Sequence, residues 1–238
     1  MKPLSDLRVK LFADGANISD ILTWYAHPLI RGFTTNPTLM RSAGVSDYEA
    51  FAREVLACVP DRPVSFEVFA DEFPEMERQA RRIAAWADNV YVKIPVTNTK
   101  REPALDLICR LTHSGIRLNV TALMTLAQVR DVCRALSGGA PAYISVFAGR
   151  IADTGRAVLP LMAAAAELIA TEPQVELIWA SPRELLNIYE ADAAGCHIIT
   201  ATSAILSKLH LVGKDLDDYS LETVQMFYND ASGSGYRL

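Results

Sequence analysis

Eight short runs of apolar or alternating residues recur along this chain, and each is followed by a stretch with the spacing of a helix. The runs are rich in Val, Ile, Phe and Tyr, or are compact apolar segments between turn residues, which is typical of buried strands. They fall at about 8–14, 31–35, 63–69, 89–95, 116–121, 142–147, 175–180 and 196–201. Alternation of strand and helix over eight strands predicts a closed parallel α/β barrel of the (β/α)8 or TIM type.

The stretches between the strands carry the apolar stripe of amphipathic helices. Predicted helices include 45–58, 74–87, 101–113, 125–136, 154–171, 183–194 and about 203–212. An open doubly wound sheet is the alternative, but it usually has fewer strands and a Gly-x-Gly-x-x-Gly first turn, which the chain lacks. No internal linker is apparent, so residues 1–238 are predicted to form one domain. An extra helix at about 220–230, within a C-terminal segment 214–238, is predicted to end in a mobile Ser-Gly-Ser-Gly tail at 232–235.

Composition excludes several classes of function. The net charge is −5, without a basic patch or a run of like charges, which argues against a nucleic-acid or membrane-surface partner. The first residues lack the apolar stretch of a signal peptide, and the longest apolar run, 158–166, is too short to span a bilayer. Four scattered cysteines predict free thiols in a reducing cytoplasm, and the four histidines lack the spacing of a metal site.

A lysine stands in the middle of the fourth predicted strand, in the sequence Val-Tyr-Val-Lys-Ile-Pro-Val at 90–96. Burying an unpaired ammonium group is costly, so Lys93 either gives up its proton or pairs with an interior carboxylate. A neutral, desolvated amine can attack a carbonyl carbon and form a Schiff base. The strand alone leaves both interpretations open.

Polar residues from several strands share the face of Lys93, because alternate side chains of a strand point to the same side. The residues on this face, near the carboxyl ends of the strands, are Asp14, Glu67, Lys93, Asn119, Thr121 and Ser145. The opposite face is apolar and suits a layer of helices. In a barrel the polar face points inward, and active sites form at its carboxyl-terminal rim. The alternative is a group of polar side chains that only satisfy one another in a core.

The loop after the seventh strand, Ala-Ser-Pro-Arg-Glu at 180–184, carries a predicted anion site. Serine before proline and a helical pattern predicts that Ser181 is an N-cap whose helix presents free N–H groups. Arg183 adds a forked cation, and Arg150 after the sixth strand adds a second one. Barrels often bind substrate phosphate in such loops. Together with an interior lysine, this arrangement predicts class I (Schiff-base) aldolase chemistry on a sugar phosphate.

Longer motifs point to one family. They are Phe-Ala-Asp at 12–14, Gly-Phe-Thr-Thr-Asn-Pro at 32–37, Glu-Val at 67–68, Val-Lys-Ile-Pro-Val-Thr at 92–97, Asn-Val-Thr-Ala at 119–122, Ser-Val-Phe-Ala-Gly-Arg-Ile-Ala-Asp at 145–153, Ala-Ser-Pro-Arg at 180–183 and Ala-Gly-Cys at 194–196. With these motifs, in this order, the chain resembles the transaldolase family, in the short-chain branch that also contains fructose-6-phosphate aldolase. The resemblance covers nearly the whole chain.

The resemblance implies roles for the polar residues. Lys93 matches the Schiff-base lysine, Asp14 matches the acid/base at the C4 hydroxyl, and Glu67 and Thr121 match the pair that holds the water used in imine formation and hydrolysis. Asn36 and Asn119 match residues that hydrogen-bond hydroxyls of the donor sugar, and Thr34 and Ser145 match pocket residues near the dihydroxyacetone unit. Phe147 is a further implied substrate-binding residue, and Arg150, Ser181 and Arg183 match the phosphate site. The resemblance implies no metal or organic cofactor, since the iminium accepts the electrons.

Two positions bear on the reaction. The fructose-6-phosphate aldolases tend to carry Gln at the position of Glu67 and Tyr at that of Phe147, so the resemblance favours a transaldolase. It would move dihydroxyacetone from sedoheptulose 7-phosphate or fructose 6-phosphate to glyceraldehyde 3-phosphate or erythrose 4-phosphate. Alternatives are aldolase-type cleavage with free dihydroxyacetone, action on a modified ketose, indicated by unfamiliar residues at 15–17, 96–100 and 182, and a non-catalytic phosphosugar-binding barrel. Short family members often use the last helix between subunits, so a homo-oligomer is expected.

Overall fold

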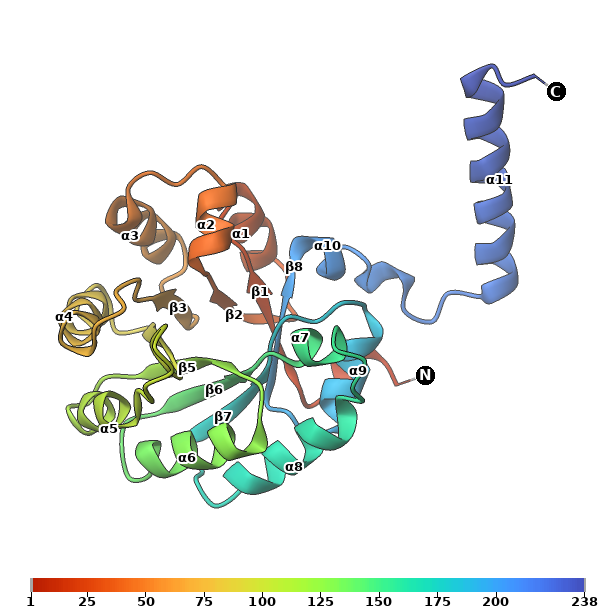
Figure 1. The fold of residues 1–238 in the computed structure, drawn as a ribbon. Helices are drawn as coiled ribbons and strands as arrows, with labels where there is room; N and C mark the ends of the chain where they lie inside the picture. Colours follow the sequence, from red (N-terminus) through yellow and green to blue (C-terminus); the bar gives the residue numbers. More distant parts are fainter. Residues whose placement is uncertain (1, 238) are drawn as a thin grey trace.

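The computed structural model describes residues 2–237 and forms a closed barrel in which each strand pairs in parallel with the next and the eighth pairs with the first (Figure 1). The strands are β1 (Lys10–Asp14), β2 (Ile30–Thr34), β3 (Val64–Glu67), β4 (Val90–Pro95), β5 (Leu118–Leu123), β6 (Ala142–Val146), β7 (Val175–Trp179) and β8 (Ile198–Thr202). The (β/α)8 barrel predicted from the alternation is confirmed, and the open doubly wound sheet is excluded.

Helices surround the barrel and cover the outer faces of the strands (Figure 1). The helices of the described chain are α1 (Ile18–Tyr25), α2 (Pro37–Ser42), α3 (Tyr48–Cys58), α4 (Phe73–Ala84), α5 (Leu105–His113), α6 (Leu126–Leu136), α7 (Ala148–Ala152), α8 (Leu159–Ile169), α9 (Leu186–Ala193), α10 (Ser203–Leu206) and α11 (Leu216–Ser234), with short 3-10 turns at Leu4–Asp6 and Leu209–Leu211. The last of them, α11, does not cover the barrel. None of the helices in this described range is long and apolar enough to cross a membrane.

The main core lies between the strands and the helices. Val92 and Ile94 of β4 are fully buried there, while Lys93 between them points into the barrel. On α4 the buried residues are Met76, Ala80 and Ile83, the spacing of one helical face. The two-residue period of the strands therefore separates an outer apolar layer from an inner face, as the sequence pattern predicts.

Several predicted boundaries are wrong. The helices predicted to begin at about 154 and 183 begin at Leu159 and Leu186, because the loops after β6 and β7 first form other structure. The predicted tail is also wrong, since residues 232–234 belong to α11 and Gly235 ends that helix in the left-handed conformation. Ser232, Gly233 and Ser234 are thus part of a regular helix.

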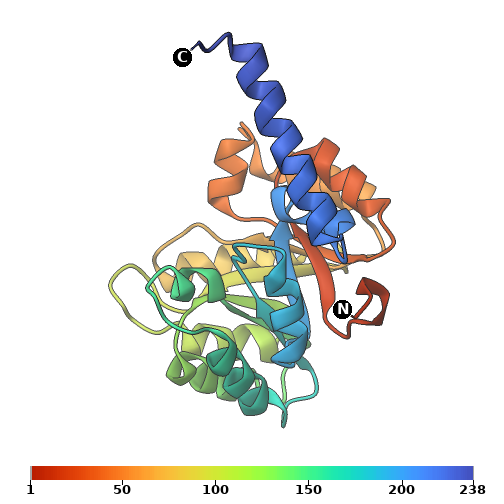
Figure 2. The ribbon, with the colours of Figure 1, turned by 90° about the vertical axis from the view of Figure 1, so that its right-hand side faces the viewer.

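Helix α11 stands away from the barrel, to which the segment after α10 connects it (Figures 1 and 2). None of its residues is buried. Its exposed apolar side chains are Leu216, Tyr219, Leu221, Val224, Met226, Phe227 and Tyr228. A helix that carries so many apolar residues normally buries a face against a partner.

Candidate active site

The carboxyl ends of the strands surround a cavity of about 460 Å³. It brings together all of the predicted site residues, namely Asp14, Thr34, Asn36, Glu67, Lys93, Asn119, Thr121, Ser145, Phe147, Arg150, Ser181 and Arg183. A mouth at this end of the strands is where barrels hold their active sites. The polar side chains of the inner face therefore line one open cavity, whereas the alternative of side chains that only satisfy one another predicts a filled core.

Lys93 lies at the base of this cavity and is only 5% exposed. Its Nζ atom lies 3.1 Å from Oε2 of Glu67 and donates a hydrogen bond of 2.9 Å to the main-chain carbonyl of Thr35. Glu67 is the direct neighbour of Lys93 in the β3–β4 register, which fixes this pairing. Lys93 is therefore paired with an interior carboxylate, which is one of the two interpretations that the strand sequence left open. The same carboxylate is within reach of any proton that the amine gives up.

Asp14 ends β1 and accepts a hydrogen bond from one threonine, which in turn bonds to a second threonine. The Thr34 hydroxyl donates a 2.7 Å hydrogen bond to Oδ1 of Asp14, and it lies 2.6 Å from the Thr200 hydroxyl. Since Thr34 has one hydroxyl hydrogen, Thr200 is the donor to Thr34. Burial raises the pKa of Asp14 above its usual range, while the charge of Lys93 and the bond from Thr34 oppose that rise.

Thr200 is a pocket residue that sequence reasoning missed. It lies on β8, where Ile198 and Thr202 share its face by alternation, and Thr202 also lines the cavity. The same two-residue period that identifies the polar residues of the other strands applies to β8. The alternation within residues 198–202 could therefore have identified Thr200 from the sequence.

A buried hydrogen-bonded row fixes the amide of Asn119. Its Nδ2 donates to Oγ of Ser65 at 3.0 Å, and Oγ of Ser145 donates to its Oδ1 at 2.7 Å. All three side chains are at most 3% exposed. Serine hydroxyls thus hold both ends of the amide and fix the plane of the Asn119 side chain.

The hydroxyl of Thr121 is buried and has no hydrogen-bond partner among the described residues. A buried hydroxyl of this kind normally costs free energy unless water or a ligand satisfies it. Thr121 lines the cavity, and its partner in the β4–β5 register is Pro95, two residues beyond Lys93 on the same strand. It is therefore placed to hold a water or a substrate atom in the pocket.

Asn36 has a structural role besides its place in the cavity. Its Oδ1 accepts the N–H of Leu39 at 2.9 Å and so caps α2, which begins with Pro37. The cap leaves the amide nitrogen of Asn36 as the group that can donate to a ligand. The resemblance predicts that this group contacts a hydroxyl of the donor sugar.

The predicted N-cap at Ser181 is wrong. Helix α9 begins at Leu186, and Ser181 adopts the left-handed conformation with φ of 59°. The N–H groups of Arg183 and Glu184 are not free, because both donate to Oδ1 of Asn187. An anion in this loop would therefore be bound mainly by side chains and not by the N-terminus of a helix.

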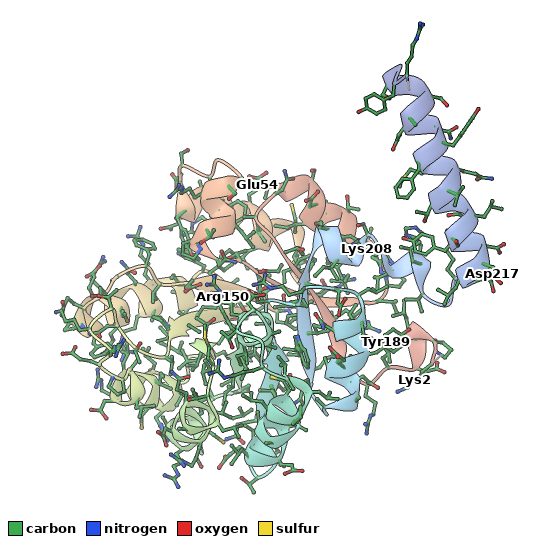
Figure 3. The ribbon with its side chains drawn as sticks, turned by 45° about the vertical axis from the view of Figure 1, so that its right-hand side comes forward. Lys2, Glu54, Arg150, Tyr189, Lys208 and Asp217 are labelled. Carbon is green, nitrogen blue, oxygen red and sulfur yellow. The ribbon has the colours of Figure 1, made fainter. Side chains whose placement is uncertain are left out.

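The two arginines nevertheless lie at the same edge of the cavity. The guanidinium group of Arg150 lies 5.7 Å from the ring centre of Phe147, and Figure 3 labels this residue over the barrel. Arg183 forms two bonds to the Asp153 carboxylate, one of them 3.1 Å from Nε to Oδ1. Asp153 thus orients the fork of Arg183, a feature that the sequence analysis did not assign.

Gly149 joins the two loops that carry these arginines. A Cβ atom at this position would lie 1.6 Å from the carbonyl oxygen of Ser181 and 3.1 Å from Nε of Arg183. Only glycine permits this approach of the loops after β6 and β7. The spacing between Arg150 and Arg183 therefore depends on the absence of a side chain at residue 149.

Comparison with known proteins gives a consistent result. Residues 11–235 match the profile of the family described as Transaldolase/Fructose-6-phosphate aldolase. The chain is 34% identical over 202 residues to a probable transaldolase of Dehalococcoides mccartyi, which covers 84% of this chain and 90% of that protein. It is 37% identical to probable transaldolase 2 of Listeria monocytogenes, covering 84% and 88%. A probable transaldolase of Exiguobacterium is 32% identical, and the match covers 94% of this chain and 99% of that protein.

Proposed function

Because the chain belongs to the transaldolase/fructose-6-phosphate aldolase family of enzymes, we propose that it transfers a dihydroxyacetone unit from a ketose phosphate to an aldose phosphate through a Schiff base on Lys93. The observation that carries the proposal is the Lys93 amine at the base of a polar cavity, 3.1 Å from the Glu67 carboxylate. Sedoheptulose 7-phosphate or fructose 6-phosphate is the donor, and glyceraldehyde 3-phosphate or erythrose 4-phosphate is the acceptor.

The chemistry begins at Lys93. Glu67 takes a proton from the ammonium group, and the neutral amine attacks the C2 carbonyl carbon of the ketose. The carbinolamine then loses water, with Glu67 and the Thr121 hydroxyl holding the water that moves the protons. The product is an iminium ion between Nζ and C2, whose positive charge makes it an electron sink.

Carbon–carbon cleavage then uses Asp14. Its carboxylate takes the proton of the C4 hydroxyl, the C3–C4 bond breaks, and its electron pair moves into the iminium to give an enamine while an aldose phosphate leaves. The enamine carbon adds to the aldehyde of a second aldose phosphate, Asp14 returns the proton, and hydrolysis frees Lys93. Arg150 and Arg183 bind the phosphate, and Asn36, Asn119 and Ser145 contact the hydroxyl groups.

Borohydride trapping tests this proposal. Reduction in the presence of fructose 6-phosphate, followed by peptide mass mapping, should give a three-carbon dihydroxyacetone adduct on Lys93. Addition of erythrose 4-phosphate should lower that adduct and yield sedoheptulose 7-phosphate. Accumulation of free dihydroxyacetone would instead favour the aldolase reaction. If no ketose gives an adduct on Lys93 while a sugar phosphate still binds, the barrel is a binding protein and the proposal is wrong.

The loop contact at Gly149 leads to a prediction for phosphate binding. In Gly149→Ala the new Cβ forces the loops after β6 and β7 apart, so Arg150 and Arg183 no longer converge. We expect the KM for fructose 6-phosphate to rise at least about tenfold and the unfolding free energy to fall by about 1–3 kcal/mol. Steady-state kinetics and urea denaturation measure the two effects. Gly233→Ala, where a Cβ has open space in helix α11, should leave the KM unchanged and should not lower the unfolding free energy.

Replacement of Thr34 by Val predicts a shift in pH dependence. The hydroxyl bond from Thr34 lowers the pKa of Asp14, so its loss lets burial raise that pKa further. Since Asp14 accepts a proton only when ionised, the acidic limb of the kcat/KM profile should move to higher pH. Thr112→Val, at a buried threonine that bonds to Ala140, should leave the limb unchanged. An unchanged limb in Thr34→Val would contradict this account of Asp14.

The raised pKa of Asp14 also makes the free energy of unfolding depend on pH. Because folding raises the pKa of Asp14, protonated Asp14 favours the folded state. That contribution is complete below the pKa of the unfolded chain and is lost as pH rises through the folded value. In Thr34→Val the loss should therefore extend to higher pH than in the wild type.

The proposal includes a homo-oligomer that uses α11. Support comes from the apolar residues that this helix exposes, among them Val224 at 60% and Phe227 at 62%. Sedimentation should give a mass well above that of the 26.1 kDa chain, and Val224→Glu with Phe227→Glu should lower it. Leu22→Glu, at an exposed leucine of α1, is the control. A monomeric wild type would contradict the proposal.

We also place the enzyme in the cytoplasm. The four cysteines are free, and Cys133 and Cys196 are buried in the fold. Free thiols of this kind are common in proteins of reducing compartments.

A further inference from the structure

The end of β3 lacks one of its expected main-chain donors. Along β2 and β3, the N–H of Phe33 bonds to the carbonyl of Pro63, and the N–H of Thr35 bonds to the carbonyl of Ser65. In a parallel ladder the next bond in this series would run from residue 37 to the carbonyl of Glu67. Residue 37 is Pro, which has no N–H and begins α2.

Tyr48 supplies the missing donor. Its hydroxyl bonds to the Glu67 carbonyl at 2.7 Å, from the first turn of α3. Burial raises the pKa of Tyr48, so the hydroxyl keeps its proton and remains a donor. The bond joins α3 to the last residue of the shortest strand in the barrel, a strand of four residues.

An aromatic cluster holds the Tyr48 ring in this position. The ring centre lies 5.5 Å from that of Phe69 and 5.8 Å from that of Trp86, and Phe66 packs edge-on at 6.4 Å. These contacts do not require the hydroxyl group. Removing the oxygen alone should therefore leave the ring in place and break only the bond to Glu67.

We propose that Tyr48 is a positioning residue that acts through Glu67. The hydrogen bond to the Glu67 carbonyl holds the peptide from which the carboxylate projects, and so sets the 3.1 Å approach of that carboxylate to Lys93. The inference rests on the proposed Schiff-base function. It assigns Tyr48 to the proton transfers of imine formation and hydrolysis, and not to carbon–carbon cleavage by Asp14.

Tyr48→Phe tests the assignment. The rate of imine formation, followed by quenching with borohydride at early times, should fall about tenfold, as expected for a modest displacement of a catalytic group. The value of kcat should fall with it, while the KM for fructose 6-phosphate stays within about twofold, because no substrate contact is removed. If Tyr48→Phe lowers only the stability of the protein, the early trapping rate will equal that of the wild type. That result would overturn the proposal.

The matched control is Tyr189→Phe. Tyr189 also donates its hydroxyl to a main-chain carbonyl, that of Lys2, at 3.1 Å. Tyr189 and Lys2 lie away from Arg150 in Figure 3. This variant loses the same type of bond and should keep the wild-type trapping rate. If it slows imine formation as much as Tyr48→Phe does, the effect is not specific to Glu67 and the proposal is wrong.

A double-mutant cycle shows whether Tyr48 acts through Glu67. In a Glu67→Gln background the carboxylate is already absent, so Tyr48→Phe should have little further effect on the trapping rate. Equal effects in both backgrounds would overturn the proposal. A wild type that forms no Schiff base at all would contradict the proposed function itself, which separates the two failures.

Discussion

Lys93→Met should abolish turnover and leave no trapped adduct. Methionine fills a similar volume but has no nucleophilic amine, so the covalent intermediate cannot form. We expect kcat to fall at least about 10⁴-fold, as is common when the nucleophile of a covalent mechanism is removed. Coupled assay of the aldose phosphate product and mass mapping after borohydride treatment measure the two effects.

The chain offers a matched lysine as the control. Lys10 lies on β1 and pairs with Glu176 of β7 at 2.6 Å, so it is also a strand lysine with a carboxylate partner. It lies at the opposite end of its strand from Asp14. Lys10→Met should keep activity and trapping. An adduct on any lysine in Lys93→Met, with residual turnover, would show that the nucleophile is elsewhere.

Alternation along the strands predicted most of the site because it is a geometric property of the backbone. In β4 it places Lys93 inward and Val92 and Ile94 outward whatever the tertiary context, and the closed barrel then brings Asp14 and Glu67 to the same rim. A position on a strand is therefore enough to predict that a side chain enters the pocket. It is not enough to predict what that side chain contacts.

The loops were predicted less well because their conformations depend on contacts between distant segments. Ser-Pro-Arg at 181–183 has the local pattern of a helix start, yet Asn187 binds the N–H groups there and the helix begins at Leu186. Ser181 takes a left-handed conformation where its carbonyl meets Gly149. That contact joins two loops about thirty residues apart in the chain, and no local pattern encodes it.

The hydrogen bond from Tyr48 to Glu67 was unpredictable for a similar reason. The absence of a donor at Pro37 is visible in the sequence, but the register of β2 on β3 is needed to see which carbonyl loses its partner. The replacement comes from a third segment, α3. Residues that position a catalytic group in this way appear only when the fold is known.

Asp14→Asn should separate imine formation from carbon–carbon cleavage. Asparagine keeps an oxygen that accepts the Thr34 hydroxyl bond, but it cannot take the proton of the C4 hydroxyl. Imine formation uses Lys93, Glu67 and Thr121, so it should proceed. Cleavage should fall by about 10³-fold, within the range expected for loss of a general base.

The mass of the trapped adduct distinguishes the two steps. With fructose 6-phosphate, the wild type should give a three-carbon adduct on Lys93, whereas Asp14→Asn should give the intact six-carbon phosphorylated adduct, because the C3–C4 bond stays unbroken. Asp71→Asn is the control, since Asp71 binds Thr99 and does not line the cavity. A three-carbon adduct at the wild-type rate in Asp14→Asn would disprove the acid/base role of Asp14. Absence of any adduct would mean that Asp14 acts before cleavage.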